Sequence, residues 1–187
     1  MKVVSHNELK QIIKIAYKRK IFLIVHGTMG KEESIIKETG KEIAKEMKRE
    51  YVEWNKVRDK EKLFEHPERY FVVVNPLPYV EFKGEKYYDI SGGLNILIGL
   101  PVISKNNTII WKISKVLEWF TLPNSAGIIF FDEIDSSLKL LARVILLMRE
   151  RKIHEKPFSD KVIIITTLKR IENLPALPFM CIELKKR

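Results

Sequence analysis

Five short, mainly apolar segments constrain the fold of this chain more than any other feature of its sequence. Runs of this length without polar alternation are typical of strands buried on both faces, as in a parallel sheet. Segments with apolar residues at helical spacing separate several of the runs, which is the order of a layered α/β domain. We therefore predict three layers around a mainly parallel, five-stranded sheet. The expected strands cover residues 21–25, 70–74, 127–131, 162–167 and 179–184.

Local signals predict the remaining elements. Ser5 and Glu8 have capping-box spacing, and the apolar residues that follow predict a helix ending near Lys18. Because no repeat, low-complexity tract or linker divides the chain, residues 1–187 are expected to form a single domain. An insert of two hairpins is expected over about residues 79–112. The first hairpin pairs residues 79–82 with 87–90, and the second pairs residues 102–104 with 108–112. Further helices are expected near residues 35–47, 58–64, 116–120 and 138–146.

Charge and cysteine content limit the class of protein. The net charge is +10, but the basic residues are mixed with Glu along the expected helices, which favours a solvated surface over a nucleic-acid site. Nucleic-acid binding stays open as an alternative. The single cysteine, Cys181, excludes an internal disulfide and fits a reducing compartment. No membrane span or signal peptide is visible, so we expect a cytoplasmic protein with no membrane partner. Abundant Lys, Glu and Ile are typical of a thermophile.

Two adjacent carboxylates follow one of the expected buried strands. The run 127–131 ends directly in Asp132 and Glu133. Open α/β sheets bind their ligands at the carboxyl ends of the strands. There, Asp132 could organise the hydration shell of Mg²⁺ while Glu133 orients or deprotonates an attacking water. The alternative is that both acids simply begin the next helix, where the macrodipole favours negative charge.

A glycine turn between the first expected strand and its helix has the position of a phosphate-binding loop. The consensus is GxxxxGK[ST], and counting from Gly27 places Ser34 at the hydroxyl position. Glu32 and Glu33 then stand where the consensus has Gly and Lys, and a carboxylate there repels phosphates. The ammonium of Lys31 could compensate.

A second register of the same turn aligns Gly30 and Lys31 with the consensus Gly and Lys. It places Val25 where the first glycine belongs and Glu32 where the metal-binding hydroxyl belongs. Because Val25 still belongs to the apolar run, the first register suits the strand better. In either register the loop lacks a required part.

Four stretches together resemble the MoxR-like branch of the AAA+ P-loop ATPases. They cover nearly the whole chain from about residue 20 to 184, and the most specific is the acidic strand with its following helix. The stretches are 26–30, 98–103 continuing through 111 to 123, 127–134 with 140–142 and 149–153, and 173–177. The resemblance implies a three-layer P-loop NTPase with an AAA+ core, and ATP and Mg²⁺ as cofactors.

Carried over by position, the resemblance also assigns roles to residues. Asp132 would hold Mg²⁺ together with Ser34, and Glu133 would be the catalytic base. Thr167 falls near the position of the family's polar sensor residue. The residues that would serve the phosphates are Gly27, Thr28, Gly30, Lys31 and Ser34.

The chain also departs from the family pattern. The place of the arginine finger reads Leu177-Pro178-Phe179, and no helical lid is expected because the sequence stops at Arg187. An arginine finger can be worth ~10³–10⁵ in rate, so hydrolysis is expected to be weak or to depend on a partner. We expect a nucleotide-binding protein of remodelling or assembly that forms homo- or hetero-oligomers with AAA+ subunits or binds a client protein. The alternatives are a catalytically inert AAA+-like subunit or adaptor, and a basic nucleic-acid-associated protein.

Overall fold

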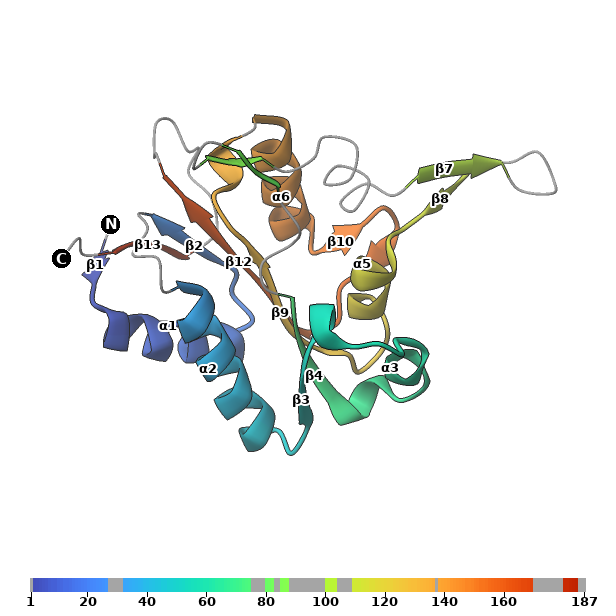
Figure 1. The fold of residues 1–187 in the computed structure, drawn as a ribbon, viewed down its shortest axis with the longest axis horizontal. Coiled ribbons are helices and arrows are strands. Elements are labelled where there is room, and N and C mark those ends of the chain that lie inside the picture. Colours follow the sequence, from blue (N-terminus) through green and yellow to red (C-terminus); the bar gives the residue numbers. More distant parts are fainter. Residues whose placement is uncertain are drawn as a thin grey trace.

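A single parallel sheet organises the computed structural model, which describes residues 2–26, 32–74, 80–82, 85–87, 100–103, 109–136, 138–169 and 180–184. Within that part of the chain, seven strands lie in the order β1-β13-β2-β12-β9-β4-β3, and every neighbouring pair is parallel (Figure 1). The strands are β1 (Lys2–Val4), β2 (Leu23–His26), β3 (Glu50–Glu53), β4 (Tyr70–Val74), β9 (Ala126–Phe131), β12 (Lys161–Leu168) and β13 (Met180–Leu184). The predicted layered α/β fold with a mainly parallel sheet is confirmed.

The expected count of five strands is wrong, because the two edge strands, β1 and β3, were not predicted from the sequence. β1 has only three residues. β3 reads Glu-Tyr-Val-Glu and is exposed or half-buried throughout. An edge strand has fewer neighbours than a central strand, so it lacks the continuous apolar run that marked the other five.

Helices cover both faces of the sheet. α1 (His6–Lys18) and α2 (Glu32–Glu46) pack side by side on one face, while α6 (Leu138–Glu150) lies on the other (Figure 1). The capping box of α1 is confirmed, since the backbone N–H of Ser5 donates to Glu8 Oε2 at 2.8 Å. The shorter helices are α3 (Glu61–Glu65) and α5 (Lys115–Phe120), with 3₁₀ turns η1 (Trp54–Lys56), η2 (Pro67–Arg69) and η3 (Ile134–Ser136). None of the described helices is long and apolar enough to cross a membrane.

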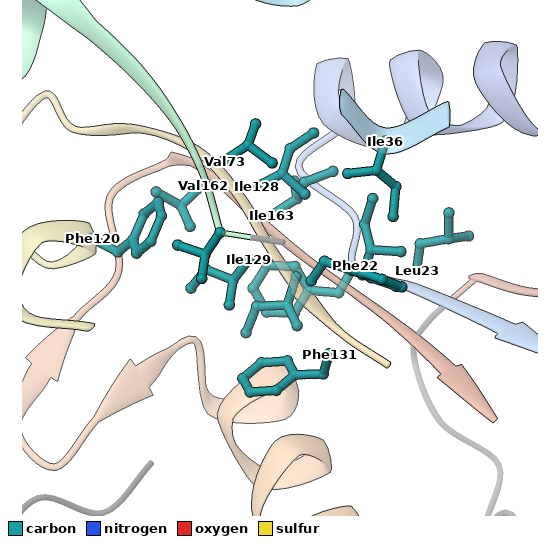
Figure 2. Close-up of a cluster of buried hydrophobic side chains, with 14 of the residues drawn as sticks. Phe22, Leu23, Ile36, Val73, Phe120, Ile128, Ile129, Phe131, Val162 and Ile163 are labelled. Atoms are coloured by element: carbon teal, nitrogen blue, oxygen red, sulfur yellow. The ribbon is translucent and has the colours of Figure 1, made fainter. Parts of the chain in front are cut away.

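The core sits on β9, all six residues of which are buried. Its side chains alternate between the layers: Ile128 lies toward the α2 side with Ile36, and Phe131 lies toward α6 (Figure 2). A Cβ on Gly127 would lie 1.9 Å from the carbonyl oxygen of Val72, its partner on β4, so this position accepts only glycine. The sequence explains the burial of β9 but not this close approach.

Gly40 lies in the middle of α2, where glycine weakens a helix. The structure gives the reason for its presence. A Cβ there would approach Val73 Cγ2 to 2.8 Å and Tyr51 Cε2 to 3.2 Å. The missing side chain therefore lets α2 pack close to β3 and β4.

Three antiparallel hairpins accompany the sheet in the described part of the chain. β5 (Val80–Phe82) pairs with β6 (Glu85–Tyr87), and β7 (Leu100–Ile103) pairs with β8 (Ile109–Lys112), as predicted in outline. The second strand of the first hairpin begins two residues earlier than expected, and the expected residues 88–90 lie outside the described part. The β7–β8 hairpin projects away from the sheet (Figure 1). The small hairpin of β10 (Lys152–Ile153) and β11 (Lys156–Pro157) was not predicted.

Candidate functional site

The strand register brings the carboxyl ends of β2, β12 and β9 to one edge of the sheet. Leu168 of β12 lies opposite His26, the last residue of β2. On the other side of β12, Thr166 lies opposite Phe131, the last residue of β9. Residues that follow these positions therefore meet at the same edge, with β12 between the other two strands.

A three-residue hydrogen-bond network joins the acidic pair to β12. The hydroxyl of Thr167 donates to Asp132 Oδ1 at 2.6 Å, and it accepts a hydrogen bond from the backbone N–H of Glu133 at 2.7 Å. The exposed fractions are 0% for Thr167, 9% for Asp132 and 8% for Glu133. Buried polar groups require hydrogen-bonded partners, and one hydroxyl here serves the carboxylate of Asp132 and the backbone N–H of Glu133. The structure thus brings together the three residues to which the sequence assigned the metal, base and sensor roles.

The backbone at Glu133 adopts an uncommon conformation. Its φ is +50°, in the left-handed region, which costs of order 1–2 kcal/mol for a residue with a side chain. The hydrogen bond from its N–H to Thr167 helps to hold this conformation. A main chain turned in this way directly after a buried strand is the kind of local strain that clusters at functional sites.

Lys169 is a residue of this site that the sequence did not reveal. Its Nζ lies 3.1 Å from Glu133 Oε2. Its backbone N–H donates to both carboxylate oxygens of Asp135 at 3.0 Å, and its carbonyl oxygen accepts a hydrogen bond from His26 Nε2 at 3.2 Å. Both main-chain polar groups of Lys169 are therefore fixed by side chains from the ends of neighbouring strands. The only sequence signal was its position directly after a buried strand.

His26 extends this edge toward β13. Its Nδ1 is buried, has no hydrogen-bond partner among the described residues, and lies 3.8 Å from Glu183 Oε1. The sequence placed His26 in the glycine turn, whereas the structure makes it the end of β2.

The start of α2 carries the other predicted ligands. Glu32 is only 6% exposed in the first turn, and Glu33 pairs with Lys37 at 2.5 Å. The hydrogen bond to Glu33 raises the pKa of Lys37. Ser34 is exposed. The predicted loop residues Gly27, Thr28, Gly30 and Lys31 lie outside the described residues, so their phosphate role stays a prediction.

The donor set at this edge suits a metal that a substrate helps to bind. Among the described residues, no group of three or more His, Cys, Asp or Glu side chains is arranged to hold a metal ion. Mg²⁺ in nucleotide enzymes does not need such a cage, because one or two carboxylates and the substrate phosphates hold it. Asp132 and Glu133 fit that smaller requirement.

A pocket of about 420 Å³ lies elsewhere, along β3 and η1. Its lining mixes acidic and basic side chains, among them Glu53, Lys56 and Asp59, and includes none of the carboxyl-edge residues described above. Its size alone does not indicate a ligand. The carboxyl edge carries the more specific chemistry.

In comparisons with known proteins, the chain matches no protein-family model, no curated protein and no solved structure. Its function must therefore be argued from its own residues.

Proposed function

We propose that this chain is an AAA+ P-loop protein of the MoxR-like branch that binds ATP with Mg²⁺ and hydrolyses it weakly or with the help of a partner. The observation that carries the proposal is the hydroxyl of Thr167 joining Asp132 and Glu133 at the carboxyl end of β9. The proposed role is in protein remodelling or assembly, within a homo- or hetero-oligomer of AAA+ subunits or with a client protein.

Each member of this network has a proposed role. Asp132 holds the hydration shell of Mg²⁺, and Glu133 accepts a proton from the water that attacks the terminal phosphate. Thr167 fixes the carboxylate of Asp132 and the main chain of Glu133. The loop over residues 27–31 and Ser34 of α2 serve the phosphates and the metal. A partner subunit supplies the arginine that is missing before β13.

The order of the strands supports a phosphate site of this kind over a dinucleotide site. In the common dinucleotide-binding order 3-2-1-4-5-6, the first strand of the fold lies beside the second. Here β2, which leads into the glycine turn, has β12 and β13 as its neighbours, and β3 lies at the far edge. β2 and β9, the strands that precede the glycine turn and the acidic pair in the sequence, are thus separated by a single strand, and that strand carries Thr167.

A second candidate function is that of an inert AAA+-like subunit or adaptor, and two observations favour it. Glu133 is already paired with Lys169, so an attacking water would compete with the ammonium for its carboxylate. Glu32 is buried in the first turn of α2, where a phosphate-binding helix would present its N–H groups to the ligand. Such a subunit would keep the fold for assembly and lack hydrolysis.

Titration with a fluorescent ATP analogue, with and without Mg²⁺, tests the proposal. We expect Mg²⁺-dependent binding that Asp132→Asn weakens roughly tenfold or more, about 1.4 kcal/mol or above. The matched control is Asp160→Asn: Asp160 is exposed, pairs with Lys20, and precedes the amino end of β12. Absence of binding at millimolar nucleotide would refute the proposal.

Turnover separates the two candidate functions. If the chain hydrolyses ATP, Glu133→Gln should abolish phosphate release while binding persists, because the amide keeps the shape of the side chain and cannot accept the proton. Mg²⁺-dependent binding without phosphate release by the wild type, alone or with its isolated partner, would support the inert subunit.

A further inference from the structure

We infer that Lys169 is a phosphate-binding cation that replaces the missing loop lysine, and that it pairs with Glu133 until a nucleotide takes its place. This inference rests on the proposed function. It differs from the expectation drawn from the sequence, in which Lys31 compensates for the loop.

The position of Lys169 suits this role. It follows β12, the strand between β2, which leads into the glycine turn, and β9, which leads into the acidic pair. Asp135 holds its N–H and His26 holds its carbonyl oxygen, so the Cα is fixed at the edge where a phosphate bound between the two strands would lie. Anchoring of this kind reduces the conformational entropy that the residue loses on binding a ligand.

The side chain is placed to change partners. It is 47% exposed, although its Nζ contacts a carboxylate that is almost completely buried. The ammonium of lysine is a compact point charge on a flexible four-carbon stem, and it can pair with a carboxylate or a phosphate through small changes in rotamer. In a partly solvated ion pair, exchange of one anion for another has a small net energy.

The local charge makes such a cation necessary. The described carboxyl edge presents four carboxylates: Asp132, Glu133, Asp135 and Glu183. A nucleoside triphosphate brought to this edge meets repulsion from these carboxylates, and a cation beside Mg²⁺ reduces it. Transfer of Nζ to the terminal phosphate would supply that cation. It would also leave Glu133 free to accept a proton, so that nucleotide binding prepares the base.

Affinity measurements on Lys169→Met test the inference. We expect ATP-analogue binding to weaken roughly 10- to 100-fold, since hydrogen bonds to charged groups have this magnitude, and binding of the matching AMP analogue to change much less. Lys169→Arg should keep most of the affinity. Lys161→Met is the matched control, because Lys161 is an exposed lysine at the opposite end of the same strand.

A double variant distinguishes direct phosphate binding from simple neutralisation of Glu133. If Lys169 binds phosphate, Glu133→Gln alone tightens ATP-analogue binding by releasing the lysine, and adding Lys169→Met to it still weakens binding at least tenfold. If Lys169 only neutralises Glu133, the effect of Lys169→Met disappears in the Glu133→Gln background, and the inference is overturned. Equal binding by the wild type and Lys169→Met would overturn the inference alone, whereas absence of binding by the wild type would overturn it together with the proposed function.

Discussion

Replacement of Thr167 by valine removes the hydroxyl that joins the two acids and keeps the shape of the side chain. That hydroxyl donates to Asp132 Oδ1 at 2.6 Å and accepts from the N–H of Glu133 at 2.7 Å, in a place with no exposure to solvent. A hydrogen bond to a charged group contributes about 1.5–3 kcal/mol, and a buried donor left without a partner costs about 1–3 kcal/mol. We therefore expect Thr167→Val to lower the free energy of unfolding by about 3 kcal/mol.

Urea denaturation of the purified chain measures this loss, and the neighbouring Thr166 provides the control. Thr166 is also completely buried, but its hydroxyl makes only a long contact of 3.5 Å with the carbonyl oxygen of Thr167. Thr166→Val should therefore cost less than about 1 kcal/mol, with an unchanged dependence on urea. Thr167→Ser, which keeps the hydroxyl, should recover most of the stability. Equal losses in the two valine variants would refute the reasoning, because they would show that the network does not stabilise the fold.

Two further changes probe the packing and the surface charge. Gly127→Ala places a methyl group 1.9 Å from the Val72 carbonyl oxygen. It should therefore lower the free energy of unfolding, measured by urea denaturation, by more than about 4 kcal/mol. A loss below about 1 kcal/mol would contradict the close approach. A hydrogen bond from Lys10, and to a smaller extent one from Lys14, lowers the pKa of Glu42 from its usual 4.5. The ionised Glu42 therefore stabilises the fold above pH 4.5, and this contribution is lost as the pH falls through the lowered folded-state pKa. The stability difference between the wild type and Glu42→Gln should thus be greatest at neutral pH and low salt. It should vanish in acid and shrink in 1 M salt. A stability difference that does not depend on pH would exclude this ion pair as its source.

The central part of the fold could be predicted because its strands are buried on both faces. Continuous apolar runs such as 127–131 have no other stable environment in an α/β protein, and the same property placed Asp132 at a strand end. β3 could not be found in this way, since its exposed Glu50 and half-buried Glu53 give it the sequence of a charged connection. The close packing of α2 against β3 and β4 at Gly40 is likewise not encoded in any local pattern.

Part of the candidate site was predictable and part was not, for a similar reason. Thr167 lies at the carboxyl end of β12, and Asp132 directly follows β9. The two residues could be predicted to lie close together, because the carboxyl ends of parallel strands meet at one edge of the sheet. Lys169 lies only two residues beyond Thr167, but its contact with Glu133 depends on the left-handed turn of the Glu133 backbone. Its anchoring depends on the register between β12 and β2. Neither the turn nor the register has a signature in the sequence.

The distribution of charge separates the nucleotide hypothesis from the nucleic-acid alternative. The net charge of +10 suggests attraction to polyanions, yet Lys10 and Lys14 of α1 are engaged by Glu42 of α2 in a ladder of ion pairs. These pairs bind two helices together and leave less positive charge for a phosphate backbone. Long-range attraction from exposed charges is also screened beyond about 10 Å at 0.1 M salt, so it does little to offset the acids at the carboxyl edge. A nucleotide at this edge must therefore depend on Mg²⁺ and on the nearest lysine, whereas nucleic-acid binding would depend on counterion release and fall steeply with salt. If the nucleotide binds at the carboxyl edge, ATP-analogue affinity should require Mg²⁺ and change little between 50 and 200 mM salt. Binding through a surface for nucleic acid does not explain this combination.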